Sequence, residues 1–491
     1  MIFELLGHDF HFELQNVCRL FLPQEKMTCV YEKTDITDQA VVTACLEKGD
    51  EQTDLFCRLR LADFEKALTA TLPNTHADYQ NECELTLCEL LYRLLSQAFG
   101  VTQAWGLVTG VRPVKLLRRL IAEQGEENAL RWMRERLLVS DKKLDLCRTT
   151  LQAENKLLSL SRPESFSLYV SIPFCPTRCD YCSFVSQTVT RAASLIPAYV
   201  ENLVKELQYT AAIAKELGLR LETVYFGGGT PTTLSAEQLG TLTDCIAKHF
   251  DLSHVREYTV EAGRPDTVTE EKLRVLKTAG VSRISINPQT LNNEVLQHIG
   301  RKHTAEQFYE AFELARRCGH DNINTDLIAG LPSDSVESFV HTTNGILQLS
   351  PESVTVHTLS MKRAANLNLQ KRADYRTADD AARMVAYSAE SLPKAGYHPY
   401  YLYRQSRTVG NQENVGWAKL GKDGLYNVYI MDETHTILAC GAGAVSKLKK
   451  PNSEYLERIF NYKFPYEYND SLQEMLNRKD NVKSFYERMR T

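Results

Sequence analysis

Two rhythms of hydrophobic and polar positions divide the chain. Up to about residue 160, short segments such as "HFELQNVCRLFL" and "DLFCRLRL" predict strands, and the longer period of "ELTLCELLYRLLSQAF" predicts a helix. The turn-forming run "SRPES" closes this region. Residues 1–160 are therefore predicted to form an N-terminal α+β domain, whose role the pattern does not indicate.

From residue 167 onward, strand and helix patterns alternate. Strands are expected near 167–172, 221–226, 256–262, 282–287, 322–328 and 353–359, and helices near 196–217, 235–249, 269–279, 303–318, 335–348 and 378–394. Such βα units form a parallel sheet with right-handed crossovers, and six of them suit a partial barrel. We predict an α/β fold for 165–395, a partial (β/α)6 barrel of the TIM type. Its chemistry should lie at the carboxyl ends of the strands.

Residues 396–491 have a different composition. The stretch "GYHPYYLYRQSRTVGNQENVGWAK" is rich in Tyr, Gly and Asn, and a charged helical pattern follows it. This region is predicted to be a small separate C-terminal module.

Composition limits the function classes. The chain of 491 residues is 43% hydrophobic and 24% charged, as in soluble globular proteins, and it contains no apolar run of about 18 residues that could span a bilayer. The N-terminus lacks the basic and hydrophobic regions of a signal peptide. The net charge of −5 gives no general attraction to nucleic acid or anionic membranes. We expect a cytoplasmic protein with neither nucleic-acid partner nor membrane span.

Three cysteines are grouped in "YVSIPFCPTRCDYCSF", directly after the first strand of the predicted barrel. The other cysteines are scattered, as buried apolar residues are in a reducing cytosol. Cys175, Cys179 and Cys182 have the spacing C-x3-C-x2-C, which fits neither a redox disulfide nor a four-ligand zinc site well. Three thiolates can instead hold a [4Fe–4S] cluster with one iron left open. Zinc binding and a chance grouping remain the alternatives.

This stretch resembles the cluster loop of radical S-adenosylmethionine enzymes. The resemblance implies two cofactors, a [4Fe–4S] cluster and S-adenosylmethionine, whose methionine moiety chelates the open iron. It extends to the end of the second strand, "YFGGGTPT", which is similar to the methionine-binding segment of that superfamily. Glycines there allow close approach of the backbone to a ligand, although such a run alone would indicate a turn. The implied binding residues are Gly227, Gly228, Gly229 and Thr230.

Four more polar residues follow later strands: Glu261 in "VEAGRPD", Gln289 in "INPQT", Arg301 in "IGRKHT" and Asp326 in "TDLIAGLP". Individually each could be a core or capping residue. Together they resemble the S-adenosylmethionine contacts of the oxygen-independent coproporphyrinogen III oxidase (dehydrogenase) family, so the resemblance implies that role for them. The match covers roughly 167–445, and "VHTLSMKRAANL", "PYYLYRQ" and "NQENVGWA" are closest to its HemZ-like subgroup.

The family resemblance implies oxygen-independent oxidative decarboxylation of coproporphyrinogen III to protoporphyrinogen IX. The alternatives are methylation or ring opening of a porphyrin, and a haem-binding or trafficking protein. Two departures from the family patterns bear on this choice. Phe184 occupies the position of a further cysteine in the well-studied oxidases, and Glu413 replaces the presumed haem-ligating His in the H-N-x-x-Y-W motif of haem chaperones.

A tetrapyrrole with propionate side chains needs cations in its binding site. Lys362 and Arg363 follow the sixth strand, and Arg404 lies among tyrosines, so these three are predicted substrate residues; surface charge is the alternative. Tyr169 matches a family tyrosine before the cluster loop and is the candidate catalytic residue, with strand packing as the alternative. The resemblance also implies a reductant protein such as flavodoxin or ferredoxin.

Overall fold

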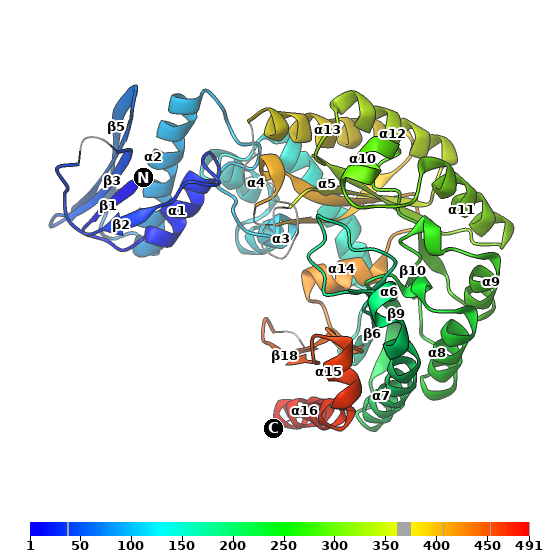
Figure 1. The fold of residues 1–491 in the computed structure, drawn as a ribbon. Coiled ribbons are helices and arrows are strands. Elements are labelled where there is room, and N and C mark those ends of the chain that lie inside the picture. The colour runs from blue at the N-terminus through cyan, green and yellow to red at the C-terminus, as the bar shows by residue number, and fades with distance from the viewer. Residues whose placement is uncertain (37–38, 361–374, 406, 452, 491) are drawn as a thin grey trace. The chain divides into compact units, whose positions relative to one another are not determined.

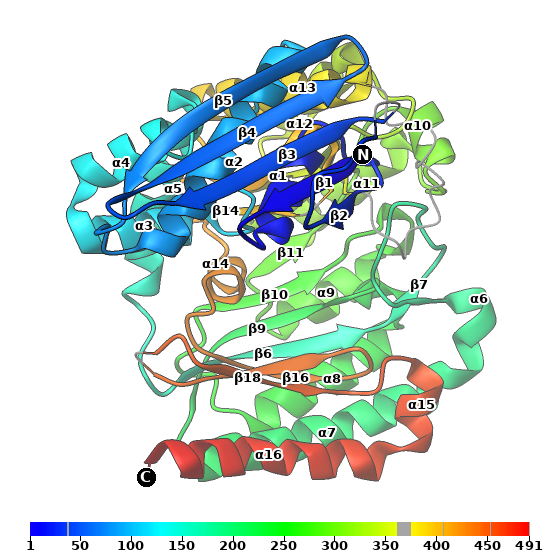
Figure 2. The ribbon, with the colours of Figure 1, turned by 90° about the vertical axis from the view of Figure 1, so that its left-hand side faces the viewer.

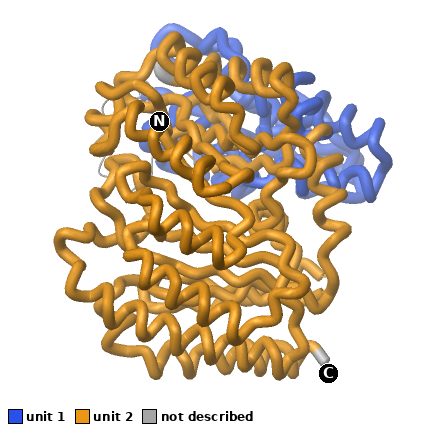
Figure 3. The backbone as a smooth tube through the Cα atoms, turned by 90° about the vertical axis from the view of Figure 1, so that its right-hand side faces the viewer, with its two compact units in different colours: residues 1–148 blue, residues 149–491 orange. Residues whose placement is uncertain are grey.

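The computed structural model describes residues 1–36, 39–360, 375–405, 407–451 and 453–490. The chain forms two compact units, residues 1–148 and 149–491 (Figure 3). The division falls within helix α5 (Asp141–Leu158). The expected division into three parts, with limits near 160 and 396, stays a prediction.

In the described part of the first unit, five strands form one mixed sheet in the order β2-β1-β3-β4-β5. The strands are β1 (Ile2–Leu6), β2 (Thr28–Val30), β3 (Val41–Lys48), β4 (Gln52–Leu61) and β5 (Phe64–Pro73), and the helices are α1 (His11–Arg19), α2 (Tyr79–Phe99), α3 (Pro113–Gln124) and α4 (Glu126–Glu135). The strand expected in "HFELQNVCRLFL" was wrong. Leu14, Val17 and Cys18 lie one helical turn apart and are buried together, which favours α1.

In the second unit, eleven of the described strands form one sheet in the order β14-β15-β13-β12-β11-β10-β9-β6-β16-β17-β18 (Figure 2), and two short strands pair separately. Its centre consists of the parallel strands β6 (Ser165–Ile172), β9 (Arg220–Gly228), β10 (Glu257–Glu261), β11 (Arg283–Ser285), β12 (Ile323–Ala329) and β13 (Ser353–Thr358). These are the strands expected from the sequence.

Helices connect these strands and lie on the convex side of the curved sheet (Figure 1). They are α7 (Ile196–Glu216), α8 (Ala236–His249), α9 (Glu270–Thr278), α10 (Asn293–His298), α11 (Ala305–Arg317), α12 (Val336–Leu349) and α13 (Tyr375–Lys394). The prediction of a partial (β/α)6 barrel is confirmed. Within the described ranges, no helix combines the length and hydrophobicity needed to cross a membrane.

The two faces of the parallel sheet differ in polarity. On β6, Phe166, Leu168 and Val170 are buried, and Tyr169 alternates with them on the opposite face. Successive strand residues point to opposite faces, so hydrophobic residues at every second position are buried beneath the helices. The polar and aromatic residues between them face the concave side, where they remain available for binding.

Side-chain caps determine where the helices begin. Ser235 and Thr304 each form a capping box with a glutamine three residues later, and the Thr269 and Ser335 side chains cap α9 and α12. A capped start satisfies backbone N–H groups that the helix itself leaves unpaired. The caps thus fix the ends of the loops that follow the strands, and these loops form the rim of the site.

Residues beyond 396 extend the same sheet at both edges. Strands β14 (His398–Arg404) and β15 (Glu413–Ala418) lie beside β13, whereas β16 (Thr436–Cys440), β17 (Val445–Lys449) and β18 (Leu456–Phe460) lie beside β6. Between the two groups, helix α14 (Leu425–Asp432) occupies the concave side (Figure 1). Helices α15 (Pro465–Asp470) and α16 (Leu472–Arg490) follow, and α16 packs on α7.

A fully buried ion pair attaches α16 to the barrel. Lys479 Nζ lies 3.1 Å from Glu206 Oε1 on α7, and both side chains are 0% exposed. Glu206 also accepts hydrogen bonds from the Gly441 N–H, from Asn461 Nδ2 and from the Tyr468 hydroxyl. Excellent hydrogen bonding of this kind is needed to offset the cost of burying two charges.

Replacing Lys479 with Ala is expected to lower the free energy of unfolding by about 3–5 kcal/mol, because Glu206 would stay buried without its cation. Urea unfolding followed by far-UV circular dichroism measures the change. Lys483→Ala is the matched control. Lys483 lies on α16 like Lys479, but its ion pair with Glu216 of α7 is partly exposed, and exposed pairs contribute about 0–1 kcal/mol. Equal effects of the two substitutions would contradict the interpretation.

Candidate functional site at the carboxyl ends of the strands

The concave face of the sheet brings aromatic and acidic side chains together. Tyr169 on β6 is opposite Tyr225 on β9, and Glu261 at the end of β10 is opposite Ser285 on β11. Asp326 lies on the same side of β12. Because these strands are parallel, their carboxyl ends meet at one edge, and side chains from five strands border a common space.

The cysteine loop begins beside this edge. Its first residues form β7 (Phe174–Cys175), which pairs with β8 (Gln187–Thr188), so that the loop closes on itself before the short helix α6 (Val189–Ala192). The Cys182 N–H donates to the Cys179 carbonyl at 3.1 Å. Burial raises the pKa of Cys175, and burial together with the other two thiols raises the pKa of Cys182 to about 11. The three sulfur atoms are therefore close enough to influence one another.

The glycine segment after β9 packs directly on the first cysteine. The Gly229 N–H donates to the Ile172 carbonyl and the Thr230 N–H donates to the Phe174 carbonyl, both at 2.8 Å. A Cβ atom on Gly229 would lie 2.6 Å from the Phe174 carbonyl oxygen and 3.0 Å from Cys175 Sγ. Gly228, with φ of +107°, makes the turn that this approach requires.

The other side of the cysteine loop is seated on the segment that follows α10. The Asp180 N–H donates to the Ile299 carbonyl at 3.1 Å, and the Thr177 hydroxyl donates to the Gly300 carbonyl at 3.2 Å. Arg301 Nε donates to the Tyr181 hydroxyl at 3.1 Å. These contacts hold the middle of the loop.

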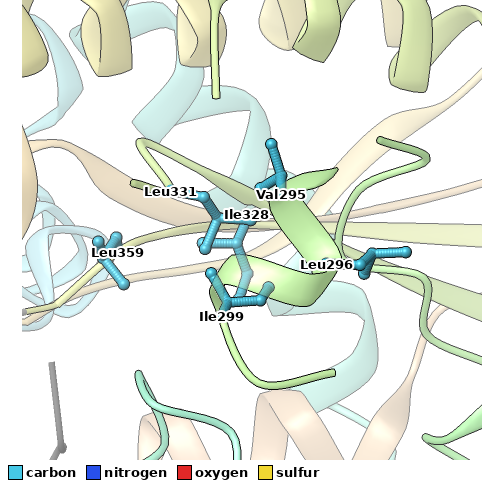
Figure 4. Close-up of a cluster of buried hydrophobic side chains, with 6 residues drawn as sticks. All are labelled: Val295, Leu296, Ile299, Ile328, Leu331 and Leu359. Atoms are coloured by element: carbon cyan, nitrogen blue, oxygen red, sulfur yellow. The ribbon is translucent and has the colours of Figure 1, made fainter. Parts of the chain in front are cut away.

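Tyr181 also anchors the loop through hydrophobic contact. Its ring packs against a cluster of buried side chains that α10 contributes together with β12 and the segments after β12 and β13 (Figure 4). The members are Val295, Leu296, Ile299, Ile328, Leu331 and Leu359. The residue between Cys179 and Cys182 is thus part of the barrel's packing.

On the concave face, the surroundings shift the pKa values of two carboxyl groups in opposite directions. Burial raises the pKa of Glu261 to about 7, although the hydrogen bond from the Tyr225 hydroxyl, at 2.5 Å, opposes the shift. Asp326 accepts hydrogen bonds from Asn287 and Asn324, and His357 Nε2 lies 3.8 Å from its carboxylate. Burial opposes ionisation of Asp326, but His357 and the amides hold its pKa below the usual range.

At this edge, one buried amide oxygen has no hydrogen-bond partner, and one buried guanidinium has no carboxylate partner among the described residues. Gln289 has φ of +69°, and its side-chain oxygen is buried without a hydrogen-bond partner. Arg301 donates to the Asn287 carbonyl at 2.6 Å and to Tyr181, but no carboxylate in the described part of the chain forms an ion pair with it. A buried amide oxygen and a buried guanidinium of this kind are suited to a ligand that carries both a donor and an anionic group.

Comparisons with known proteins identify the family of the chain. The profile of the Radical SAM superfamily matches residues 169–344. The oxygen-independent coproporphyrinogen-III oxidase-like protein HemZ of Bacillus subtilis is 36% identical over 482 residues, which are 96% of this chain and 95% of that protein. The fold and the cysteine loop define a radical S-adenosylmethionine protein. Within that superfamily, the chain belongs to the oxygen-independent coproporphyrinogen III oxidase-like family.

Relatives within this family have different names. The heme chaperone HemW of Lactococcus lactis is 38% identical over 244 residues, which are 49% of this chain and 62% of that protein. The solved structure of coproporphyrinogen III oxidase HemN from Escherichia coli has a TM-score of 0.51 and 22% identity, and the match covers 66% of this chain and 73% of that one. This structural likeness concerns the fold.

The residues present fit the cofactors that the superfamily implies. Three thiols lie in one loop, and the orphaned Gln289 oxygen and the Arg301 guanidinium lie nearby. Within the described ranges, no three His, Cys, Asp or Glu side chains converge on a single metal ion. This is compatible with a [4Fe–4S] cluster, since its cysteine ligands each bind a different iron.

The remaining predicted residues lie in varied positions. Tyr169 is half-buried, with its ring 6.2 Å from that of Tyr225 and 6.0 Å from that of Tyr426. Arg404 is buried and donates to the Asn411 carbonyl at 3.0 Å, and burial lowers its pKa to about 10. Lys362 and Arg363 lie outside the described residues. The substrate roles of these three cations stay predictions.

Several residues at the site were not among the predicted ones. His357 follows the same alternation as Thr355 in "SVTVHTL", so the strand pattern could have indicated it. Asn287 lies in "INPQT" and Arg264 in "VEAGRPD", so their positions directly after strands are the signal that indicates them. Tyr426 comes from α14, and nothing in the sequence indicates that this helix enters the concave side.

Gly229→Ala is expected to abolish cluster assembly in a folded protein, because the new methyl group would overlap the Phe174 backbone and displace Cys175. Iron content and the absorption near 400 nm after anaerobic reconstitution measure the effect, with Cys175→Ala as the reference for complete loss. Gly240→Ala on α8 is the control, since its Cβ would meet only Val275 at 3.7 Å. Full iron retention in Gly229→Ala would contradict the packing argument.

Proposed function

We propose that the chain catalyses oxygen-independent oxidative decarboxylation of coproporphyrinogen III to protoporphyrinogen IX. The observation that carries the proposal is the position of the cysteine loop beside a concave face lined by tyrosines and acids at the carboxyl ends of the strands. End-to-end similarity to the HemZ protein supports it. For each propionate that becomes a vinyl group, the radical takes one hydrogen atom, CO2 is released and one electron passes to an external one-electron acceptor. Two propionates react in this way.

Cys175, Cys179 and Cys182 would hold the cluster. Gly227, Gly228, Gly229, Thr230, Glu261, Gln289, Arg301 and Asp326 would hold S-adenosylmethionine. When bound, these two groups supply a carbon-centred radical that removes a hydrogen atom from an unactivated carbon. An external one-electron carrier protein would provide the reducing electron. The role of the protein is to position the cofactor and the substrate and to exclude side reactions.

An aromatic wall is available for the substrate. Tyr225 stacks on Tyr426 with ring centroids 4.3 Å apart, and Tyr169 stacks on both. Burial raises the pKa of Tyr169, so its hydroxyl stays protonated and can donate a hydrogen bond to a substrate carboxylate. Tyr169 and Tyr225 are partly exposed, so their rings would contact a pyrrole and the Tyr169 hydroxyl would orient the substrate.

Helix α14 closes the amino-terminal side of this space. The Leu425 N–H donates to the Glu257 carboxylate at 2.6 Å and the Tyr426 N–H donates to it at 3.4 Å. An acid at the first turn of a helix stabilises its unpaired N–H groups. This anchoring fixes the ring of Tyr426. It also helps to exclude water at the amino-terminal end of the concave space, away from the cysteine loop.

The position of Glu413 favours the enzyme over a haem-binding protein. Glu413 lies on β15, between β13 and β14, and is 1% exposed. Its carbonyl accepts from the Thr358 hydroxyl, and the neighbouring Asn414 side chain accepts from the Thr358 N–H. A carboxyl buried in the strand next to the sheet edge is poorly suited to bind haem iron, although similarity to HemW makes haem binding the alternative to test.

Anaerobic turnover is the direct test of the proposal. Reconstituted protein with dithionite, S-adenosylmethionine and coproporphyrinogen III should yield tetrapyrroles that have lost CO2 and two hydrogens once and twice, together with 5′-deoxyadenosine. Mass spectrometry measures both products, and Cys175→Ala should yield neither. Unchanged tetrapyrrole with abundant deoxyadenosine would indicate another substrate. A stoichiometric Soret shift on adding haem, without turnover, would support the haem-binding alternative.

Binding of S-adenosylmethionine should weaken at acidic pH. The pKa of Glu261 is raised to about 7, so the carboxylate is ionised above that pH and becomes protonated below it. Since a cationic ligand binds the ionised form, affinity should fall about tenfold per pH unit below 7. Anaerobic calorimetry between about pH 6 and 8.5 measures this dependence. Glu261→Gln corrects for titration of the ligand itself, and an equal pH dependence in both proteins would contradict the assignment.

A further inference from the structure

Arg264 is a buried arginine that the proposed reaction does not use. It lies three residues after Glu261, in the loop that follows β10, and is 3% exposed. Its Nε and one terminal nitrogen donate to the two oxygens of the Asp266 carboxylate, each at 3.0 Å. This bidentate pair fixes the plane of the guanidinium group.

The remaining nitrogen of the guanidinium points into the cysteine loop. It donates to the Thr177 hydroxyl at 3.1 Å and to the Thr177 carbonyl at 3.3 Å, and it lies 3.8 Å from Cys179 Sγ. Arg264 thus connects the loop after β10 to two residues of the loop that carries the thiols. A surface ion pair would need neither this burial nor these contacts.

The planar shape of arginine allows one side chain to contact both loops at once. One edge of the guanidinium is occupied by Asp266, and the other is free to donate to Thr177 and Cys179. Lysine presents a single ammonium point charge, and glutamine has neither the charge nor the reach to make both sets of contacts. The position therefore requires an arginine for both contacts at once.

A second cation reinforces the positive potential at Cys179. Burial disfavours its charge, yet Tyr181 and Cys179 hold the pKa of Arg301 above the ordinary value. His303 lies close to both arginines, and burial together with their charges lowers its pKa to about 3, so the ring stays neutral. Anionic thiolates carrying an iron–sulfur cluster would neutralise this potential.

We propose that Arg264 is a positioning residue that holds Cys179 in its ligating geometry and donates a hydrogen bond to the cluster-bound sulfur, so that the cluster is retained and is easier to reduce. The inference rests on the proposed cluster site. Outer partners of metal ligands typically change metal affinity by about 10–100-fold. Hydrogen bonds to the ligating sulfurs are also among the factors that determine the reduction potential.

Arg264→Gln in the full chain tests this inference through the cluster itself. We expect iron to be lost to a ferrous chelator at least about tenfold faster than from the unchanged protein. We also expect a smaller fraction of the cluster to be reduced at a fixed solution potential, measured by anaerobic redox titration of its absorption. In both measurements, Arg264→Lys should give values between those of Arg264→Gln and the unchanged protein, because lysine keeps the charge but cannot reach both partners.

Arg274→Gln is the matched control, since Arg274 is an exposed arginine on α9 that pairs with Glu270. It should behave as the unchanged protein in both measurements. Thermal unfolding followed by circular dichroism checks the fold of each variant. If Arg264→Gln does not fold, the two measurements on Arg264→Lys decide the test. Iron loss within about twofold of the unchanged protein and an unaltered titration in both Arg264 variants would overturn the inference.

The same experiment separates this inference from the proposed function. Failure of the unchanged protein to assemble any cluster would overturn the cluster site and the role of Arg264 together. A stable cluster that Arg264→Gln leaves unaffected would overturn the role of Arg264 alone. Loss of retention and reducibility in Arg264→Gln supports the inference whichever tetrapyrrole the enzyme converts.

Discussion

The close approach of two backbone segments at Gly229 is the constraint on which the site depends. The loop that carries the thiols begins where the Phe174 carbonyl accepts the Thr230 N–H, and no side chain fits between the two segments. Strand β9 therefore fixes the position of Cys175. From there, Arg264 contacts the middle of the loop, and the residues around Ile299 support it from the segment that follows α10. The thiols are preorganised because three neighbouring βα units each hold one part of the loop that carries them.

Charge is arranged around this loop in a way that favours a bound ligand. Arg264 has its own carboxylate partner, whereas Arg301 pairs with a hydroxyl and a carbonyl. Across the concave face, Glu261 is held partly protonated and Asp326 is held ionised. Cations beside the thiols and acids beyond them complement a ligand with separated charges. A bound ligand of this kind would help to offset the cost of burying these charges.

The C-terminal region is as much a part of the site as the parallel strands are. Strands β14 to β18 extend both edges of the sheet, and α14 brings Tyr426 against Tyr169 and Tyr225. The same arrangement buries Glu413 on β15, between β13 and β14. The C-terminal region thus determines the aromatic contacts of Tyr169 and Tyr225 and the burial of Glu413.

The amino-acid sequence by itself determined the six parallel strands and their helices, because hydrophobic periodicity depends only on neighbouring residues. It also determined which polar residues would follow strands β6, β9, β10 and β12, since strand ends collect at one edge of a parallel sheet. The tertiary structure alone decided what these residues contact. The approach of Arg264 to Cys179, the entry of Tyr426 and the burial of Glu413 arise from segments distant in the chain, and local periodicity carries no information about such contacts. In the same way, α1 became a helix because burial against its unit outweighed the strand-like pattern.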